Sequence, residues 1–225
     1  MTSPLDYDNA YDLRCEMVAD QLEYRGIEQK NLLKAFKDVP RHLFIPNISL
    51  EEAYQDNPIP IKAGQTISQP YVVALMLTYL ELEKNNDVLE IGSGSGYATA
   101  ILSHLCKQVD AMEVFSELII DAKSVIEKLS LQNISMFQQS AWEQLKTTKV
   151  YDRIILWASP PKVPRHLFDN LKEGGIMVTP EGKNEQYVWI YKKKMGKIEK
   201  QMKDAVRFVP LVQGSAAEID SSMRG

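Results

Sequence analysis

The sequence has few of the residues that build metal sites and disulfide frameworks. Its 225 residues include two cysteines, Cys15 and Cys106, and three histidines, His42, His104 and His166, at unrelated spacings. Two cysteines are too few for a secreted disulfide framework or a cysteine-rich zinc site, and scattered histidines lack the spacing of zinc ligands. We therefore expect reduced cysteines and no metal site.

The sequence also lacks a basic excess and long apolar runs. Lys and Arg number 26 against 30 Asp and Glu, and the formal net charge of −4 does not indicate a nucleic-acid-binding surface. No apolar run approaches the roughly eighteen residues of a membrane-spanning helix. The N-terminus lacks the basic and then apolar pattern of a secretory signal. We expect a cytoplasmic monomer with neither a nucleic-acid nor a membrane partner.

The most informative stretch that is present is Asp87-Val-Leu-Glu-Ile-Gly-Ser-Gly-Ser-Gly-Tyr97. A strand, a glycine turn and a helix N-terminus form the nucleotide-holding corner of an open α/β sheet. A phosphate-binding loop would end in Gly-Lys-Ser/Thr, and Tyr97 excludes it. A dinucleotide fingerprint, G-x-G-x-x-G, would need glycine at position 97, so we keep it only as a disfavoured alternative.

The pattern acid-x-Gly-x-Gly-x-Gly resembles motif I of S-adenosylmethionine-dependent methyltransferases. The resemblance implies that Glu90 faces the ammonium group of the cofactor, because a carboxylate offers a cationic amine only acceptors. It also implies that Glu113, at the end of the next strand, holds the ribose, with Phe115 beside the adenine; the alternative for Glu113 is a helix-capping acid. The cofactor-binding residues expected from this motif are Glu90, Gly92, Ser93, Gly94, Gly96, Glu113 and Val114.

Further motifs resemble one family, the protein-L-isoaspartate O-methyltransferases, and most closely its bacterial members. The resemblance covers residues 14–214, and the segment 64–71 is its family-specific part. The motifs are Arg25-Gly-Ile, Val39-Pro-Arg-His-Leu-Phe, Gly64-Gln-Thr-Ile-Ser-Gln-Pro-Tyr71, the glycine loop, Tyr151-Asp-Arg-Ile-Ile155, Leu171-Lys-Glu-Gly-Gly175 and Arg207-Phe-Val-Pro-Leu211.

The resemblance implies an enzyme that methylates the free carboxylate of L-isoaspartyl residues in damaged peptides and proteins, with S-adenosylmethionine as donor. Ser68 is then the candidate catalytic residue, with its hydroxyl bonded to the substrate carboxylate. Gln65, Thr66 and Ile67 would lie over the cofactor, and residues 207–211 would help to seat the peptide. The alternative for Ser68 is the N-cap of a helix over residues 70–82.

Two stretches depart from the family pattern. Where the family usually carries Gly-Asp-Gly to hold adenine, this chain has Gln139-Ser-Ala141 followed by Trp142, so Ser140 and Ala141 are the implied adenine-side residues. Trp157 and Pro160 replace small residues after a later strand; Trp142 and Trp157 would either stack on adenine or pack in the fold. The departures keep two alternatives open: a relative that methylates another carboxylate, and an inactive binding protein on the same fold.

The alternation of strand-like and helix-like segments predicts an α/β fold, a doubly wound, mostly parallel, Rossmann-like sheet with a helical N-terminal extension. We expect one domain over residues 1–225: the extension and substrate loop in 1–70, the cofactor-binding core in 71–214, and a disordered tail in 215–225. The hexapeptide Val-Pro-Arg-His-Leu-Phe occurs at 39–44 and 163–168, which we interpret as two proline-started turns rather than a duplicated site. Helices are expected at residues 11–24, 31–37, 70–82, 97–107, 117–129 and 163–171, strands at 88–91, 108–113, 133–138, 151–156, 176–180 and 207–212, a turn at 174–175, and a hairpin of 186–192 with 197–202.

Overall fold

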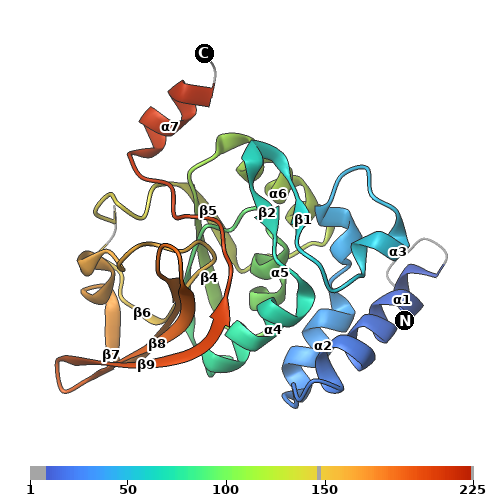
Figure 1. Ribbon diagram of the computed structural model, residues 1–225, viewed down its shortest axis with the longest axis horizontal. Helices are drawn as coiled ribbons and strands as arrows, with labels where there is room; N and C mark the ends of the chain where they lie inside the picture. Colours follow the sequence, from blue (N-terminus) through green and yellow to red (C-terminus); the bar gives the residue numbers. More distant parts are fainter. Residues whose placement is uncertain (1–8, 146–147, 224–225) are drawn as a thin grey trace.

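The fold is built on a seven-stranded sheet, drawn from green to orange-red in Figure 1. A computed structural model of the protein describes residues 9–145 and 148–223. The strand order is β5-β4-β3-β6-β7-β8-β9; the first five of these strands run parallel, and β8 and β9 form an antiparallel hairpin at one edge. The strands are β3 (Asp87–Ile91), β4 (Gln108–Glu113), β5 (Ile134–Gln138), β6 (Tyr151–Leu156), β7 (Leu171–Glu181), β8 (Gln186–Lys194) and β9 (Lys197–Val206).

The chain order reverses direction across the sheet at β3. From this strand, β4 and β5 follow on one side, whereas β6 and β7 lie on the other. In open α/β sheets a ligand binds outside the carboxyl ends of the strands at such a switch point. The topology therefore directs attention to the loops that follow β3, β4 and β6.

Side-chain alternation along the strands divides the core in two. Val88 of β3 and Ile155 of β6 belong to one buried cluster, and their neighbours Leu89 and Ile154 belong to a second. Because successive strand residues point to opposite faces, both faces of the central strands are buried, as their near-continuous apolar sequences predict. The first face is covered by helices, and the second is packed against segments 141–145 and 163–168.

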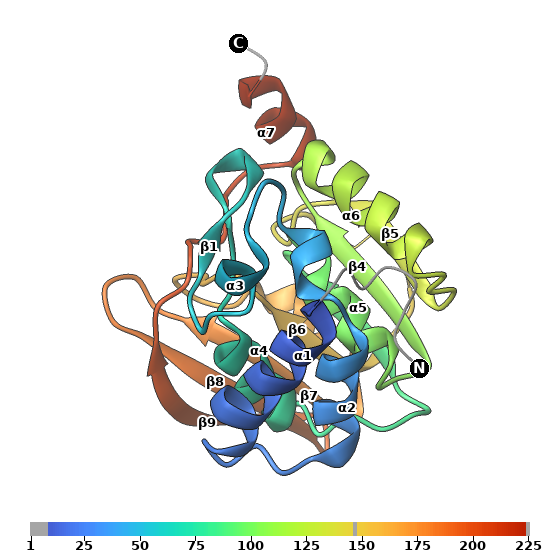
Figure 2. The same ribbon diagram turned by 90° about the vertical axis from the view of Figure 1, so that its right-hand side faces the viewer.

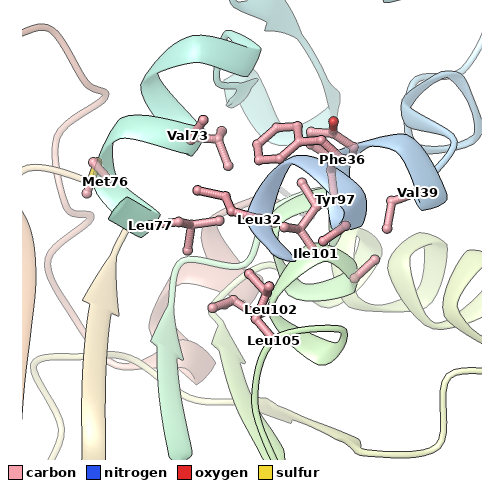
Figure 3. Close-up of a cluster of buried hydrophobic side chains, with 14 of the residues drawn as sticks. Leu32, Phe36, Val39, Val73, Met76, Leu77, Tyr97, Ile101, Leu102 and Leu105 are labelled. Carbon is pink, nitrogen blue, oxygen red and sulfur yellow. The ribbon is translucent and has the colours of Figure 1, made fainter. Parts of the chain in front are cut away.

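Three of the helices that cover the first face pack their side chains against one another, as Figure 3 shows. Leu32 and Phe36 of α2, Val73 and Leu77 of α4, and Ile101 of α5 are all buried in this cluster. The helical segments are α1 (Ala10–Glu16), the π-helix η1 (Met17–Glu23), α2 (Lys30–Asp38), the 3-10 helix η2 (Arg41–Phe44), α3 (Leu50–Ala53), the 3-10 helix η3 (Lys62–Gly64), α4 (Pro70–Tyr79), α5 (Tyr97–Ser103), α6 (Ser116–Lys128), the 3-10 helix η4 (Arg165–Phe168) and α7 (Ala216–Met223).

The N-terminal extension packs beside the sheet and ends in a small hairpin. Strands β1 (Ile59–Pro60) and β2 (Thr66–Ile67) pair antiparallel through the turn η3. Figures 1 and 2 show this hairpin near α6, and an ion pair of 2.6 Å joins Lys62 of the turn to Asp121 of α6. The extension therefore delivers residues 64–68 to the end of the sheet where β3 and β4 terminate.

The structure confirms the predicted fold class and most elements, and corrects several segments. The helix predicted at 163–171 is only the 3-10 helix η4, and the strand predicted at 207–212 is an extended loop with one bridge, from Pro210 to Ser159. The turn predicted at 174–175 lies inside β7, where the pairing with β6 shifts register and Gly174 has a φ of 76°. Helix α7 forms in the segment that the sequence predicts to be disordered, and its Ile219 packs against Phe115 and Leu118.

Among the helices of the described ranges, 9–145 and 148–223, none combines the length and apolar character needed to cross a bilayer.

Candidate active site

An open pocket, called the cavity below, lies at the carboxyl ends of β3, β4 and β6. In an open α/β sheet this is where a ligand is expected to bind. The only charged residue among the described lining residues is Glu113. The wall consists of Gln65, Thr66, Ile67, Ser68, Val73, Ile91, Gly92, Ser93, Gly94, Ser95, Tyr97, Ala98, Met112, Glu113, Val114, Phe115, Gln139, Ala141, Trp157, Ala158, Val209, Pro210, Leu211 and Val212.

Glu113 organises the glycine loop from the neighbouring strand. Its Oε2 accepts a hydrogen bond of 2.8 Å from the Gly94 N–H, and its Oε1 accepts from the N–H groups of Val114 at 2.7 Å and Phe115 at 3.2 Å. Burial raises the pKa of Glu113, and these three bonds partly oppose the rise. An ionised carboxylate has about four acceptor sites, so capacity remains for a ligand hydroxyl.

The last glycine of the loop is needed for packing. Gly96 is the N-cap of α5 with a φ of 84°, a left-handed conformation that favours glycine. A Cβ at this position would lie 2.8 Å from the Cβ of Ala122 in α6. Gly96 does not line the cavity, so its absence of a side chain lets α6 approach the loop instead of a ligand.

Glu90 is completely buried behind the cavity wall, with 0% of its surface exposed. Glu90 and Trp157 point to the same sheet face from adjacent parallel strands, and the indole Nε1 donates a hydrogen bond of 2.8 Å to Glu90 Oε1. Glu90 Oε2 has no hydrogen-bond partner among the described residues. Burial raises the pKa of Glu90 to about 7, an effect to which Glu113 adds and which Trp157 and the nearby Thr99 hydroxyl offset.

Ser68 lines the cavity, and among the described residues its hydroxyl makes no hydrogen bond to the N-terminus of α4. The N-cap of this helix is Gln69, and the Tyr71 N–H is satisfied by Asp56 Oδ1 at 2.9 Å. Asp56 Oδ2 also accepts from Gln69 Nε2 at 3.1 Å and from Arg25 at 2.6 Å. The predicted alternative role of Ser68 as N-cap is therefore wrong, and its hydroxyl is available to a ligand.

The residues that follow β5 divide between the cavity and the interior. Gln139 and Ala141 line the cavity, whereas Ser140 is fully buried and its Oγ accepts a hydrogen bond of 3.2 Å from the Trp142 N–H. Glu143 Oε2 accepts from the Ser140 N–H at 3.1 Å. Ser140 does not line the cavity, so the structure does not support the predicted contact between its hydroxyl and adenine.

The last wall of the cavity comes from residues 209–212, far along the chain. The Ser159 N–H donates to Val209 O at 2.8 Å, and the Leu211 N–H donates to Ser159 O at 2.9 Å, which fixes the segment beside the end of β6. Glu143 Oε2 also accepts a hydrogen bond of 3.2 Å from the Ala216 N–H at the start of α7. The segment is therefore held at both ends.

The structure brings most predicted site residues together. Three predicted residues do not line the cavity but lie behind its wall: Glu90, Gly96 and Ser140. Three lining residues were not predicted, because apolar and amide side chains carry no chemical signature in the sequence: Gln139, Ala158 and Val212. Among the described residues, no three His, Cys, Asp or Glu side chains group to hold a metal ion. The predicted residues in the wall are Gln65, Thr66, Ile67, Ser68, Gly92, Ser93, Gly94, Glu113, Val114 and Ala141.

A mostly parallel sheet whose glycine loop and neighbouring strand-end acid share one cavity defines the class of S-adenosylmethionine-dependent methyltransferases. The match to one family is more specific. The family described as protein-L-isoaspartate(D-aspartate) O-methyltransferase matches residues 14–216, and the chain belongs to this family.

Similar proteins support this membership over almost the whole chain. Protein-L-isoaspartate O-methyltransferases of Pectobacterium carotovorum subsp. carotovorum (strain PC1) and Sodalis glossinidius are each 42% identical, over 91% and 92% of this chain and 98% and 99% of theirs. A Plasmodium falciparum structure described as a protein-L-isoaspartate O-methyltransferase, in complex with S-adenosyl-L-homocysteine, is 25% identical with a TM-score of 0.80, covering 89% of this chain and 99% of its own. Another structure of that name is 27% identical with a TM-score of 0.81, covering 89% of this chain and 66% of its own.

Proposed function

We propose that this protein transfers the methyl group of S-adenosylmethionine to the free carboxylate of L-isoaspartyl residues in damaged proteins and peptides. The observation that carries the proposal is the meeting of two motifs in one cavity. The glycine loop with Glu113 forms one side, and the family-specific segment 64–68, with the free Ser68 hydroxyl, forms the other. A cofactor site and an acceptor site are thereby adjacent.

The cavity residues fit this cofactor. Glu113 retains acceptor capacity for ribose hydroxyls, and the apolar residues Val114 and Phe115 flank it where an adenine would pack. Ala141 and Gln139 complete this side, and we assign the adenine contact to the wall that they form in place of the Ser140 hydroxyl. The cofactor-binding set is therefore Gln65, Thr66, Ile67, Gly92, Ser93, Gly94, Glu113, Val114 and Ala141, with Glu90, Gly96 and Ser140 supporting it from behind.

The proposed methyl transfer requires no proton transfer by a side chain of the protein. When bound, the cofactor supplies an activated methyl group on a sulfonium. A carboxylate with an ordinary pKa of about 4 is already ionised at neutral pH and needs no general base. The task of Ser68 is to orient that carboxylate by donating a hydrogen bond, and correct orientation accounts for on the order of 7 kcal/mol of barrier or more in such reactions.

Transfer of a labelled methyl group to a paired set of peptides tests the proposed activity. We expect labelling of a peptide that contains L-isoaspartate and none of its aspartate twin, because only the isoaspartyl residue presents the free α-carboxylate. Equal labelling of both peptides, or labelling of neither with the cofactor bound, would contradict the substrate assignment. Labelling of other small carboxylates alone would indicate a relative with a different acceptor.

Replacement of Ser68 tests the assigned role of its hydroxyl. Ser68→Ala removes a hydrogen bond to a charged group, worth roughly 1.5–3 kcal/mol, so kcat/KM for the isoaspartyl peptide should fall by about tenfold or more. Binding of S-adenosylhomocysteine, measured by calorimetry, should not change. Ser68→Thr, which keeps the hydroxyl, is the matched control, and unchanged kcat/KM in the alanine variant would refute the role.

The expectations of a monomer and of a cytoplasmic location are part of the same proposal. A formal net charge of −4, and the absence of basic residues from the described part of the cavity wall, support a peptide, and not a nucleic acid, as the partner. Light scattering of the purified protein and fractionation of cells test the two expectations directly.

A further inference from the structure

Trp157 is the wall residue for which the motifs assign no function. It follows β6, and its backbone N–H donates to Ile91 O at 3.0 Å, which places it beside the start of the glycine loop. Its side chain is 8% exposed and lines the cavity together with Ala158, Ile67, Ser68 and the 209–212 segment. Trp157 therefore lies where the cofactor loop and the acceptor loop meet.

Trp157 and Glu113 line the cavity from opposite sides of β3. Glu113 follows β4, on one side of β3, whereas Trp157 follows β6, on the other side. If Glu113 receives the ribose, as the proposed function requires, the methyl group would have to lie near Ser68 to reach the acceptor. The cation of the donor would then be held on the side of the cavity that Trp157 and Ser68 line together.

Among the described residues, no carboxylate lines the cavity on the Trp157 side of β3. Glu90 is withheld from the cavity, with its Oε1 bonded to the indole N–H at 2.8 Å and none of its surface exposed. Among the described lining residues the single charged group is Glu113, which follows β4 on the other side of β3. An indole ring attracts ligand cations more strongly than any other aromatic side chain, and an N–H bond to a carboxyl group polarises it further.

From this placement, and resting on the proposed function, we propose that Trp157 is a specificity-determining residue: its indole, held in place by Glu90, favours the cationic methyl donor over the neutral demethylated product. S-adenosylmethionine and S-adenosylhomocysteine share the ammonium, carboxylate, ribose and adenine groups. They differ by the methyl group and its sulfonium charge. Discrimination at Trp157 would therefore assist release of the product after transfer.

Calorimetric binding of the two ligands to Trp157 variants tests the proposal. Trp157→Leu should weaken S-adenosylmethionine about tenfold more than S-adenosylhomocysteine, and Trp157→Phe should show a smaller loss of preference because a ring remains. Trp189→Leu, the same substitution outside the cavity wall, should leave both affinities unchanged. An equal loss for both ligands in Trp157→Leu would show a merely structural role and overturn the proposal.

Two further measurements keep the result interpretable. Glu90→Gln retains an acceptor for the indole and should change the preference between the ligands by less than Trp157→Leu; a larger change would assign the cation to Glu90. A W142F/W189F variant keeps Trp157 as its sole indole, and its fluorescence should respond more to the donor than to the product. Identical responses contradict the proposal even if Trp157→Leu fails to fold. A wild-type protein that binds neither ligand would instead contradict the proposed function.

Discussion

Glu90 and Glu113 show how two carboxyl groups of one site acquire different tasks from their surroundings. Glu113 accepts three backbone N–H bonds and lines the cavity, whereas Glu90 is sealed behind Trp157 with one oxygen unpartnered among the described residues. Hydrogen bonds to the charged form favour ionisation, and burial without a counter-charge opposes it. The first acid is therefore suited to a ligand, and the second to holding a side chain.

Glu90 should make stability depend on pH in a definite direction. Burial raises the pKa of Glu90 from 4.5 to about 7, so its contribution is fully present below pH 4.5 and is lost as the pH rises through 7. Glu90→Gln stays neutral, and should gain stability relative to the wild type over this interval, on the order of 3 kcal/mol. Urea unfolding of both proteins without cofactor, between about pH 5 and 8, measures the difference.

A neighbouring acid enters that measurement. The charge of Glu113 adds to the rise in the Glu90 pKa, and burial raises the pKa of Glu113 as well, whereas the buried Cys106 thiol stays protonated and uncharged over this pH interval because burial raises its pKa. Glu127→Gln on the exposed side of α6 serves as the matched control and should give a curve parallel to the wild type. A parallel curve for Glu90→Gln as well would contradict the assigned burial effect.

At the scale of elements, the start of α4 determines what Ser68 can do. Asp56 supplies the cap through the Tyr71 N–H, and the Arg25 guanidinium that pairs with Asp56 lies 3.3 Å from the centre of the Tyr71 ring. A cap from a distant loop replaces the local serine cap. The extension thereby holds the acceptor loop without using the hydroxyl that the reaction needs.

Removal of the Asp56 cap should impair the acceptor loop more than the cofactor site. For Asp56→Ala we expect a loss of about 1 kcal/mol in unfolding free energy and a several-fold fall in kcat/KM for the isoaspartyl peptide. The affinity for S-adenosylhomocysteine should be preserved, because no glycine-loop contact is lost. Asp56→Asn keeps the acceptor for the Tyr71 N–H and should recover much of the loss; equal defects in both variants would assign the effect to charge instead.

The repeated hexapeptide separates local from tertiary determinants. Both copies form 3-10 helices, η2 and η4, as two similar turns should. Arg41 of the first copy is fully buried, donates from Nε to Ala53 O at 2.9 Å and lies over the Tyr97 ring, whereas Arg165 of the second is exposed. The same local sequence therefore forms the same kind of turn in both places, but the tertiary structure buries one arginine and exposes the other.

At the scale of the whole molecule, the C-terminal part closes a cavity that the middle of the chain builds. The 209–212 segment pairs with Ser159, and α7 then docks Ile219 on Phe115 and Leu118 beside the cofactor loop. Figure 1 shows α7 as the outermost helix, reached by a long extended segment. Closure of the site therefore depends on packing between distant parts of the sequence.

Loosening α7 should weaken cofactor binding while sparing the core. Ile219→Ala removes a buried side chain from a small satellite cluster, and we expect up to about a tenfold loss in S-adenosylhomocysteine affinity from a cavity-forming truncation of this kind. Hydrogen exchange of the amides at 209–216 should accelerate. Ile120→Ala is the matched control, since Ile120 is 67% exposed on α6; unchanged exchange in Ile219→Ala would mean that α7 does not brace the segment.

The elements that the sequence predicts correctly are those with a local signal. The period of apolar residues predicted β4 to the residue and α6 within one, and the glycine spacing of the loop indicated the cofactor class before any contact was known. The prediction is wrong where an element depends on a partner: residues 207–212 have strand-like composition, but among the described residues only Ser159 forms a bridge with them. Helix α7 escaped prediction because its Ile219 packs against Phe115 and Leu118, a tertiary contact that the local sequence does not encode.

The sequence by itself determined the α/β class, the glycine loop with its acid at the end of β4, and the family-specific loop at 64–68, because these depend on side-chain period and on backbone freedom at particular residues. Only the tertiary structure decided that Asp56 caps α4, that Glu90 bonds Trp157 behind the wall, and that Ser140 is turned inward. These outcomes depend on which distant groups satisfy buried donors and acceptors. Spacing along the chain does not encode that pairing; the packing of the extension, the sheet and the C-terminal segment does.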